Sequence, residues 1–322
     1  MAVRWLRTLP SEAPMIRFTL VLVSLPLGAA LAQEPAPAVQ ELLVPVAAAE
    51  SLRVTVTGAG ETVVLVPGLF GSAFGYRHLL ALLPAAGYRA LVVEPLGIGG
   101  SPRPRGADYS LTAQAERIAT ALERLGEGPA VVVGHSVGVS LALRLAVHHP
   151  ERVRAVIALD GGPAEAAATP GFRRAMRYAP WIKWLGGVKR IRPKMRQDLI
   201  AASGDASWVT DEVMDGYTAA AAADLDGTLL AFLAMADARE RDRLAPRLSD
   251  IRCPVRLILG TAPHAGGVDE AQVRLMRDRL PEFAVDSIAG AGQYLFEEQP
   301  EAVAELIGRV MEGRATALGV SR

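Results

Sequence analysis

The segment Val131–Val139 constrains the fold of this chain more than any other. It reads VVVGHSVGV: a β-branched apolar run meets Gly-x-Ser-x-Gly, and a helix-like pattern follows at once. A strand–turn–helix sequence of this kind holds Ser136 on a sharp, strained turn, where a serine can act as a nucleophile. Gly134 and Gly138 let the backbone approach its neighbours without a Cβ atom. The amide of Val137, at the start of the helix, is free to face a developing oxyanion.

This motif resembles the nucleophile elbow of the α/β-hydrolase superfamily, and a second motif extends the resemblance. Residues 67–71 read PGLFG, where family members usually have His-Gly-x-x-Gly and carry another oxyanion amide. The resemblance implies that the amide of Leu69 or Phe70 is the second donor beside that of Val137. It covers about residues 52–312.

Strand-like and helix-like segments alternate along most of the chain. Continuous apolar runs, such as 62–66, are typical of buried parallel strands. The strands that we expect lie at 52–56, 62–66, 89–94, 131–133, 153–160, 255–260 and 283–288. With right-handed crossovers, this order predicts an α/β protein with a doubly wound, mostly parallel sheet, which the resemblance specifies as the α/β-hydrolase fold.

The alternation stops near Pro163 and returns near Pro254, with only helical patterns between them. The helices that we expect there lie at 172–185, 194–202, 211–223 and 228–238. Many α/β hydrolases insert a helical cap after the sixth strand, so the resemblance implies a cap over the active site. Residues 171–196 of this cap contain nine basic residues and no acid. We favour a solvated helix face there, and peripheral contact with anionic lipid is the alternative.

Residues 1–32 predict a cleaved signal peptide. Arg17 precedes an uncharged apolar run, and Ala-Leu-Ala ends it as a small-residue cleavage site. Met15 is an alternative start to Met1. A membrane anchor is the rival interpretation, but the run is shorter than the roughly 20 residues that span a bilayer. We therefore expect a periplasmic or secreted protein.

These patterns divide the chain into six segments. They are the signal peptide 1–32, a leader 33–50, the first part of the hydrolase core 51–162, the cap 163–250, the second part of the core 251–313 and a tail 314–322.

Composition argues against several partners and cofactors. The chain has 34 basic and 34 acidic residues, so its net charge gives no reason to expect nucleic acid. The only cysteine, Cys253, cannot form an internal disulfide. Prolines rather than a helix follow the glycines of 97–101, so we expect no dinucleotide. His148 and His149 lack a third ligand in the sequence, and we expect neither metal nor cofactor.

The resemblance also implies where the partners of the serine should lie, and both positions are altered. Family members usually carry an acid in Gly-x-x-Asp after the strand at 255–260, and a histidine in Gly-x-Gly-His after the last strand. This chain has Pro263 and Gln293 at those positions. An amide cannot accept a proton from serine, so the usual base is missing.

Two residues of the catalytic edge are candidates to substitute for them. His264 follows the strand at 255–260 and could be a relocated base, oriented by Asp160 or Asp269; the alternative is an ordinary loop histidine. Asp160 ends another strand and could be the acid, as in family variants that place it there; the alternative is a residue that closes a turn.

The sequence leaves two functional hypotheses. The first is an exported hydrolase of an ester or related acyl substrate that uses Ser136 with a non-standard or impaired triad. The second is a catalytically inactive hydrolase-fold protein that binds a small apolar ligand or a protein partner under its cap. Substrate identity and oligomeric state are not specified by the sequence.

Overall fold

The computed structural model describes residues 38–167, 173–174 and 187–313, which lie within the structural unit Pro37–Arg322. The predicted signal peptide, the tail and most of the predicted helix 172–185 fall outside the described residues. The same is true of Arg177 and Lys183 of the basic cap segment.

The core of the structure is an eight-stranded sheet with the order β1-β2-β4-β3-β5-β6-β7-β8. Its strands are β1 (Gln40–Ala47), β2 (Glu50–Thr57), β3 (Thr62–Val66), β4 (Arg89–Glu94), β5 (Ala130–His135), β6 (Val153–Leu159), β7 (Val255–Gly260) and β8 (Phe283–Ile288). The pairs β1–β2 and β2–β4 are antiparallel, and all other pairs are parallel. This arrangement confirms the predicted fold class.

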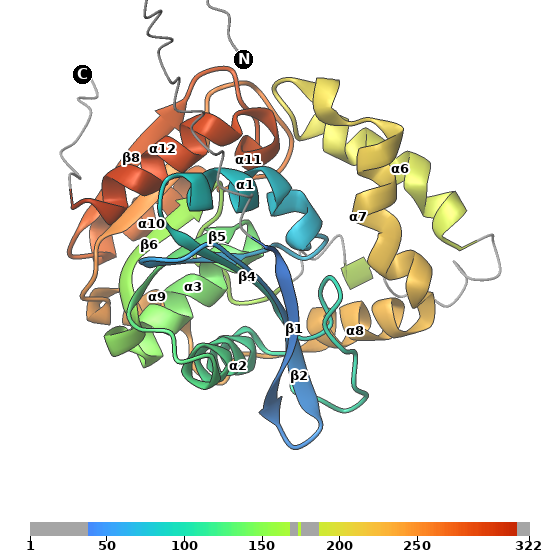
Figure 1. Cartoon of the computed structure of the whole chain (residues 1–322), viewed down its shortest axis with the longest axis horizontal. Helices are drawn as coiled ribbons and strands as arrows, with labels where there is room; N and C mark the ends of the chain where they lie inside the picture. The colour runs from blue at the N-terminus through green and yellow to red at the C-terminus, as the bar shows by residue number, and fades with distance from the viewer. Residues whose placement is uncertain (1–37, 168–172, 175–186, 314–322) are drawn as a thin grey trace, which may run out of the picture. The chain divides into compact units, whose positions relative to one another are not determined.

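Helices cover both faces of the sheet (Figure 1). They are α1 (Arg77–Ala85), α2 (Leu111–Arg124), α3 (Val137–His148), α10 (Glu270–Arg279), α11 (Leu295–Glu298) and α12 (Pro300–Met311), with the short α9 (Leu244–Arg247). Alternate residues of β3 enter two separate cores, because side chains of a strand alternate between its faces. Val64 and Val66 pack with α2 and α3, whereas Val63 and Leu65 pack with α1 and α12.

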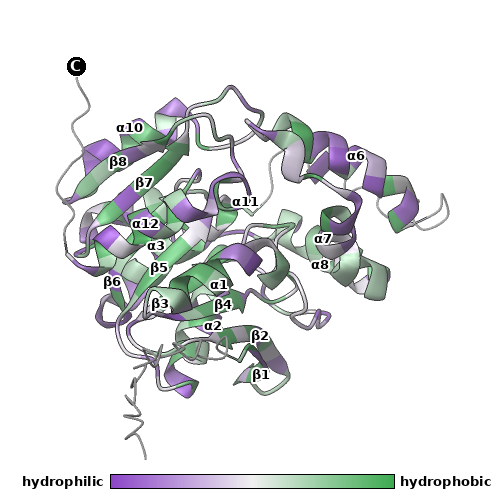
Figure 2. Cartoon of the chain, turned by 45° about the horizontal axis from the view of Figure 1, so that its top comes forward, coloured by the Kyte–Doolittle hydropathy of each residue, from purple (hydrophilic) through white to green (hydrophobic). Residues whose placement is uncertain are grey.

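The cap follows β6, and its regular structure within the described residues is helical. It contains α6 (Val188–Ala201), α7 (Asp211–Ala223) and α8 (Leu225–Asp237), which lie together beside the core (Figure 1). Figure 2 shows that α6 is the most hydrophilic of the three. No single helix in the described part of the chain is long and apolar enough to cross a membrane. The pair α7 and α8 meets that test only together, across a bend of 89°.

The basic residues of α6 are partly neutralised by acids of α7. Arg192 donates to Asp211 and Asp215, and Arg196 also pairs with Asp211. Lys194 pairs with Asp198 one turn further along α6. Exposed ion pairs of this kind contribute little to stability, but they remove much of the net positive charge of the helix face.

Both ends of the cap are attached to the nucleophile helix by a buried arginine. Arg144 of α3 is only 1% exposed. Its guanidinium lies 3.1 Å from the carboxylate of Glu165, which precedes the cap helices, and 3.5 Å from that of Glu240, which follows α8. Because buried charges are stable only when they are paired, these contacts hold the two connections of the cap on α3.

Strand β1 corrects one boundary that was drawn from the sequence. The segment 33–50 was expected to be a leader, yet Gln40–Ala47 pairs with β2 at the edge of the sheet. Only Val44 of this strand is buried, and Pro45 interrupts its apolar pattern. Edge strands carry such weak patterns because one side has no partner strand, which explains the error.

Candidate active site

The elbow has the strained geometry that its sequence predicts. Ser136 has φ 53° and ψ −119° between β5 and α3, a conformation that costs about 1–3 kcal/mol for a residue other than glycine. A Cβ atom on Gly138 would collide with the carbonyl oxygen of Val66, and one on Gly161 would collide with the Ser136 backbone. Glycines at these two positions therefore make room for the turn.

The loop 67–71 lies against the nucleophile. A Cβ atom on Gly68 would lie 3.3 Å from the Cβ atom of Ser136, so the two backbones are in close contact. The amide of Gly71 donates to the carbonyl of Gly68 at 2.9 Å and closes the turn, whereas within the described residues the amide of Leu69 has no hydrogen-bond partner. Val137 is the first residue of α3, and the first amides of a helix lack intrahelical acceptors.

Phe70 connects this loop with the cap. Its ring packs edge-to-face on that of Phe232 in α8, with 5.3 Å between the ring centroids, and 45% of Phe70 is exposed. The oxyanion candidates Leu69, Phe70 and Val137 thus lie on two elements that meet at Ser136, as expected from the sequence. Their role in binding an oxyanion stays a prediction.

Glu94 binds the backbone just after residues 67–71, which we call the oxyanion loop. Its buried carboxylate accepts hydrogen bonds from the amides of Ala73, at 2.7 Å, and Gly100, at 2.6 Å. Burial raises the pKa of Glu94, and these two amides oppose that effect. The carboxylate therefore joins the chain after the oxyanion loop to the glycine loop that follows β4.

The structure brings His264 and Asp160 together. Nε2 of His264 lies 2.9 Å from Oδ2 of Asp160, and Nδ1 lies 2.7 Å from the carbonyl oxygen of Ala262. Oδ1 of Asp160 accepts from the amide of Val268 at 3.2 Å. Burial raises the pKa of Asp160, while the Val268 amide and His264 oppose that effect.

This pairing bears on the chemistry that His264 can perform. A carbonyl oxygen accepts only, so Nδ1 carries a proton, and Nε2 faces a carboxylate. Either the imidazole is doubly protonated or Asp160 holds the second proton. In both cases no nitrogen lone pair of His264 is available to Ser136 in this arrangement. That His264 acts as a base and Asp160 as its acid stays a prediction. The contact between them shows only how the His264 ring is oriented.

Gln293 lies beside the elbow at the usual base position. Its backbone contacts the imidazole of His135, the residue before the nucleophile, and the neighbouring Tyr294 ring lies 5.2 Å from that imidazole. His135 is buried, and burial lowers its pKa to about 4 against the opposing Gln293 contact. Among the described residues the Gln293 amide group has no hydrogen-bond partner.

The altered acid position lies in the same rim of loops. Pro263 is exposed and precedes His264. Two glycines of this loop separate the two candidate groups: Gly266 lies against the Gln293 amide, and Gly267 lies against the Asp160 carboxylate. The backbone of this loop therefore contacts both residue 293 and Asp160, the acid that the sequence suggested as a partner of His264.

A buried polar cluster connects the cap with the helix after Gln293. The carboxylate of Glu297 is fully buried and accepts from Arg77 at 2.7 Å and from the Tyr217 hydroxyl of α7 at 2.9 Å. Burial raises the pKa of Glu297, and the bonds from Arg77 and Tyr217 oppose that effect. This cluster fixes α7 on α11, close to the elbow.

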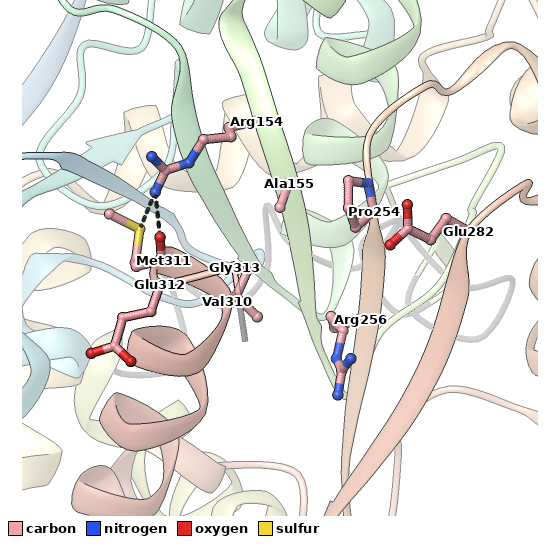
Figure 3. Close-up of a pocket in the computed structure, with 9 residues that line it drawn as sticks. All are labelled: Arg154, Ala155, Pro254, Arg256, Glu282, Val310, Met311, Glu312 and Gly313. Carbon is pink, nitrogen blue, oxygen red and sulfur yellow. Dashed lines mark hydrogen bonds between the residues drawn. The ribbon is translucent and has the colours of Figure 1, made fainter. Parts of the chain in front are cut away.

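A separate pocket of about 400 Å³ lies at the opposite edge of the sheet (Figure 3). It is lined by Arg154 and Arg256, near the amino ends of β6 and β7, and by Glu282. Arg256 forms a two-point ion pair with Asp286, and Arg154 donates to the backbone of Met311. The pocket is therefore distinct from the candidate active site, which lies at the carboxyl ends of the strands.

No group of three or more His, Cys, Asp or Glu side chains is arranged to hold a metal ion within residues 38–167 and 187–313. His148 and His149 instead face the carboxylate of Glu116, and His149 lies 2.8 Å from it.

The elbow, the oxyanion loop and the capped sheet together define a family. Residues 61–256 match the family model described as alpha/beta hydrolase fold, so the chain belongs to that family.

Its relatives are hydrolases. It is 38% identical over 104 residues to bifunctional epoxide hydrolase 2 of Sus scrofa, a match that covers 32% of this chain and 19% of that protein. The chain thus spans about a fifth of the length of that relative. It is 28% identical over 251 residues to the uncharacterized hydrolase YugF of Bacillus subtilis, which covers 77% of this chain and 88% of that one. The structure of epoxide hydrolase CorEH superimposes with a TM-score of 0.71 at 16% identity, over 86% of this chain and 99% of that chain.

Proposed function

We propose that this protein hydrolyses an ester or related acyl substrate through Ser136, with a triad that is impaired because Gln293 replaces its base. The observation that carries the proposal is the strained backbone of Ser136, φ 53° and ψ −119°, next to the loop 67–71. In this reaction Oγ of Ser136 bonds to the acyl carbon and loses its proton to water, because residue 293 is no base, while amides of Val137 and the loop receive the oxyanion. The bond from the acyl carbon to the ester oxygen then breaks, the alcohol leaves with a proton from water, and a second water molecule hydrolyses the acyl-enzyme to the acid and free Ser136.

We further propose that the protein acts outside the cytoplasm, on the basis of the signal-like residues 1–32. A small apolar acyl compound suits a site in which Phe70, from the loop 67–71, packs on Phe232 of the cap helix α8. The ion pairs of Arg192 and Arg196 favour a solvated α6 over a lipid-binding one.

A second candidate is a catalytically silent protein that binds an apolar ligand or a partner protein under the cap. Two observations favour it: an amide replaces the base at position 293, and both ring nitrogens of His264 face acceptors. A serine without a base loses most of the roughly million-fold contribution of a triad.

A fluorophosphonate probe separates the two candidates, because it reports nucleophilic serine. The proposed function predicts slow labelling of the wild-type protein that Ser136→Ala abolishes. If His264 leaves its present contacts to act as the base, His264→Ala abolishes labelling as well.

Gln293→His should accelerate labelling, with Gln293→Asn as the control that keeps an amide. We expect a gain of no more than about 100-fold, because a serine–histidine pair without its acid recovers only part of the rate of a triad. Asp160 cannot supply that acid while His264 and Val268 occupy it. Labelling that appears only in Gln293→His would refute the enzyme proposal and favour the silent protein.

A further inference from the structure

The end of cap helix α6 is bonded to both loops that carry the altered triad positions. The carbonyl oxygen of Ala201 accepts from the amide of Ala265, at 2.7 Å, in the loop after β7. The next carbonyl, that of Ala202, accepts from the amide of Gln293, at 2.8 Å, in the loop after β8. The last carbonyls of a helix lack partners within it, so these loops satisfy them.

One carboxylate completes this junction. Glu298, the last residue of α11, accepts from the amide of Gly292 at 3.0 Å, just before Gln293. The same carboxylate accepts from the amides of Gly204 at 2.8 Å and Asp205 at 2.9 Å, just after α6. A single side chain therefore joins the cap backbone to the backbone of the loop that carries residue 293.

The backbones at this junction are packed too closely for side chains. A Cβ atom on Gly204 would lie 2.6 Å from that of Ala262 and would collide with the carbonyl oxygen of Gly290. A Cβ atom on Gly292 would lie 2.5 Å from the Gly204 amide nitrogen. With so little free space, a shift of the Gly292 amide must move the neighbouring chain as well.

His135 connects residue 293 with the nucleophile. The Gln293 backbone and the Tyr294 ring both contact the His135 imidazole, whose backbone continues directly into Ser136. Displacement of the loop 290–293 would therefore change both the distance from residue 293 to Ser136 and the burial of His135.

We propose that Glu298 is a positioning residue of the active site, which sets the place of residue 293 relative to Ser136 by bonding its loop to the end of α6. This inference rests on the proposed function, because the position of residue 293 affects a reaction only if Ser136 reacts. It assigns the cap a role in aligning the site in addition to covering it.

The first test does not depend on reactivity. In the full-length protein, the His135 imidazole is titrated by NMR and assigned by its loss in His135→Gln. Burial holds the pKa of His135 near 4 in the wild type. We expect Glu298→Ala to raise it by about one unit or more, because the displaced loop admits water to the ring. Glu298→Gln keeps an acceptor oxygen and should restore most of the wild-type titration.

The second test uses Gln293→His as the background and measures fluorophosphonate labelling of Ser136. Glu298→Ala should lower the maximal labelling rate constant about 100-fold with little change in probe affinity, since a displacement of about 1 Å has effects of that size. Glu301→Ala is the matched control: it removes the same charge from an exposed position three residues away. Glu298→Asp, which only retracts the carboxylate, provides a milder variant if Glu298→Ala does not fold.

Failure of the two proposals can be told apart. If no variant that retains Ser136 is labelled, the proposed function fails while the His135 titration still decides the role of Glu298. If Glu298→Ala and Glu298→Asp titrate and label like Glu301→Ala, Glu298 does not position residue 293 and the inference is wrong.

Discussion

The buried imidazole of His135 should make the stability of this protein depend on pH in a way that one substitution can isolate. The residue is 5% exposed and packs between the rings of Tyr294 and Phe296, at centroid distances of 5.2 Å and 4.8 Å. Within the described residues its Nε2 has no hydrogen-bond partner. Protonation would therefore place an unsolvated charge directly beside the nucleophile.

The magnitude follows from the pKa of His135 in the two states. Burial holds it at about 4 in the folded protein, whereas an unfolded histidine titrates near 6.5. The folded pKa is the lower one, so the contribution to stability is complete above pH 6.5 and is lost as the pH falls toward 4. The full loss is roughly 3 kcal/mol, of which about 2 kcal/mol occurs between pH 6.5 and pH 5.

The assay compares urea unfolding of the wild type and His135→Gln at several pH values between 7.5 and 4.5. Glutamine does not titrate, so the difference in unfolding free energy between the two proteins should shrink as the pH falls. Asp160 and Glu297 have the opposite effect, because their raised pKa values favour the folded state at low pH. Both proteins contain these two acids, so their effect cancels in the difference between the unfolding free energies. The control His149→Gln changes a surface histidine beside a carboxylate, and the loss of stability at low pH that is due to His135 should persist in it. A difference that stays constant across this range would refute the assigned burial of His135.

Two further substitutions test how the cap is attached. Arg144→Met should lower the unfolding free energy by about 3–5 kcal/mol in urea unfolding, because it leaves two acidic side chains without their buried partner; a loss below about 1 kcal/mol would show that the pair is solvated. Tyr217→Phe removes a donor from the buried Glu297 carboxylate and should cost about 1–3 kcal/mol at pH 7. The Tyr217→Phe loss should shrink as the pH falls, because burial raises the pKa of Glu297 and a protonated carboxyl depends less on the Tyr217 donor; a loss independent of pH would contradict that account.

The fold could be predicted because its signals are local. The strands at 62–66 and 283–288 match β3 and β8 residue for residue, and the helix 211–223 matches α7. In each case an apolar run or a capped helical pattern specifies the element without reference to the rest of the chain. Strand β1 was missed because its only partner is β2, and its own sequence is mostly exposed.

The site could be predicted only in part, because much of it depends on contacts between distant loops. The elbow motif alone located Ser136, and strand ends placed Asp160 and His264 at one edge of the sheet. The sequence could not show that both ring nitrogens of His264 face acceptors, one of them 104 residues away. Nor did it indicate Glu298, whose partners lie on the cap and on a loop; the only available signal was an acid two residues ahead of the proline that begins a helix.

The two functional hypotheses differ most clearly in what they predict for Ser136→Ala. Triad residues act as a unit, so a site already disabled by Gln293 has little left to lose, and its residual hydrolysis would come from the oxyanion hole and binding. The silent-protein hypothesis therefore predicts that any background ester hydrolysis is unchanged by Ser136→Ala, whereas the proposed function predicts a loss of at least about tenfold. Leu69→Pro removes an amide of the oxyanion loop, and under the proposed function it should reduce hydrolysis by about 100-fold. Hydrolysis that survives both substitutions would place the reaction outside this site altogether.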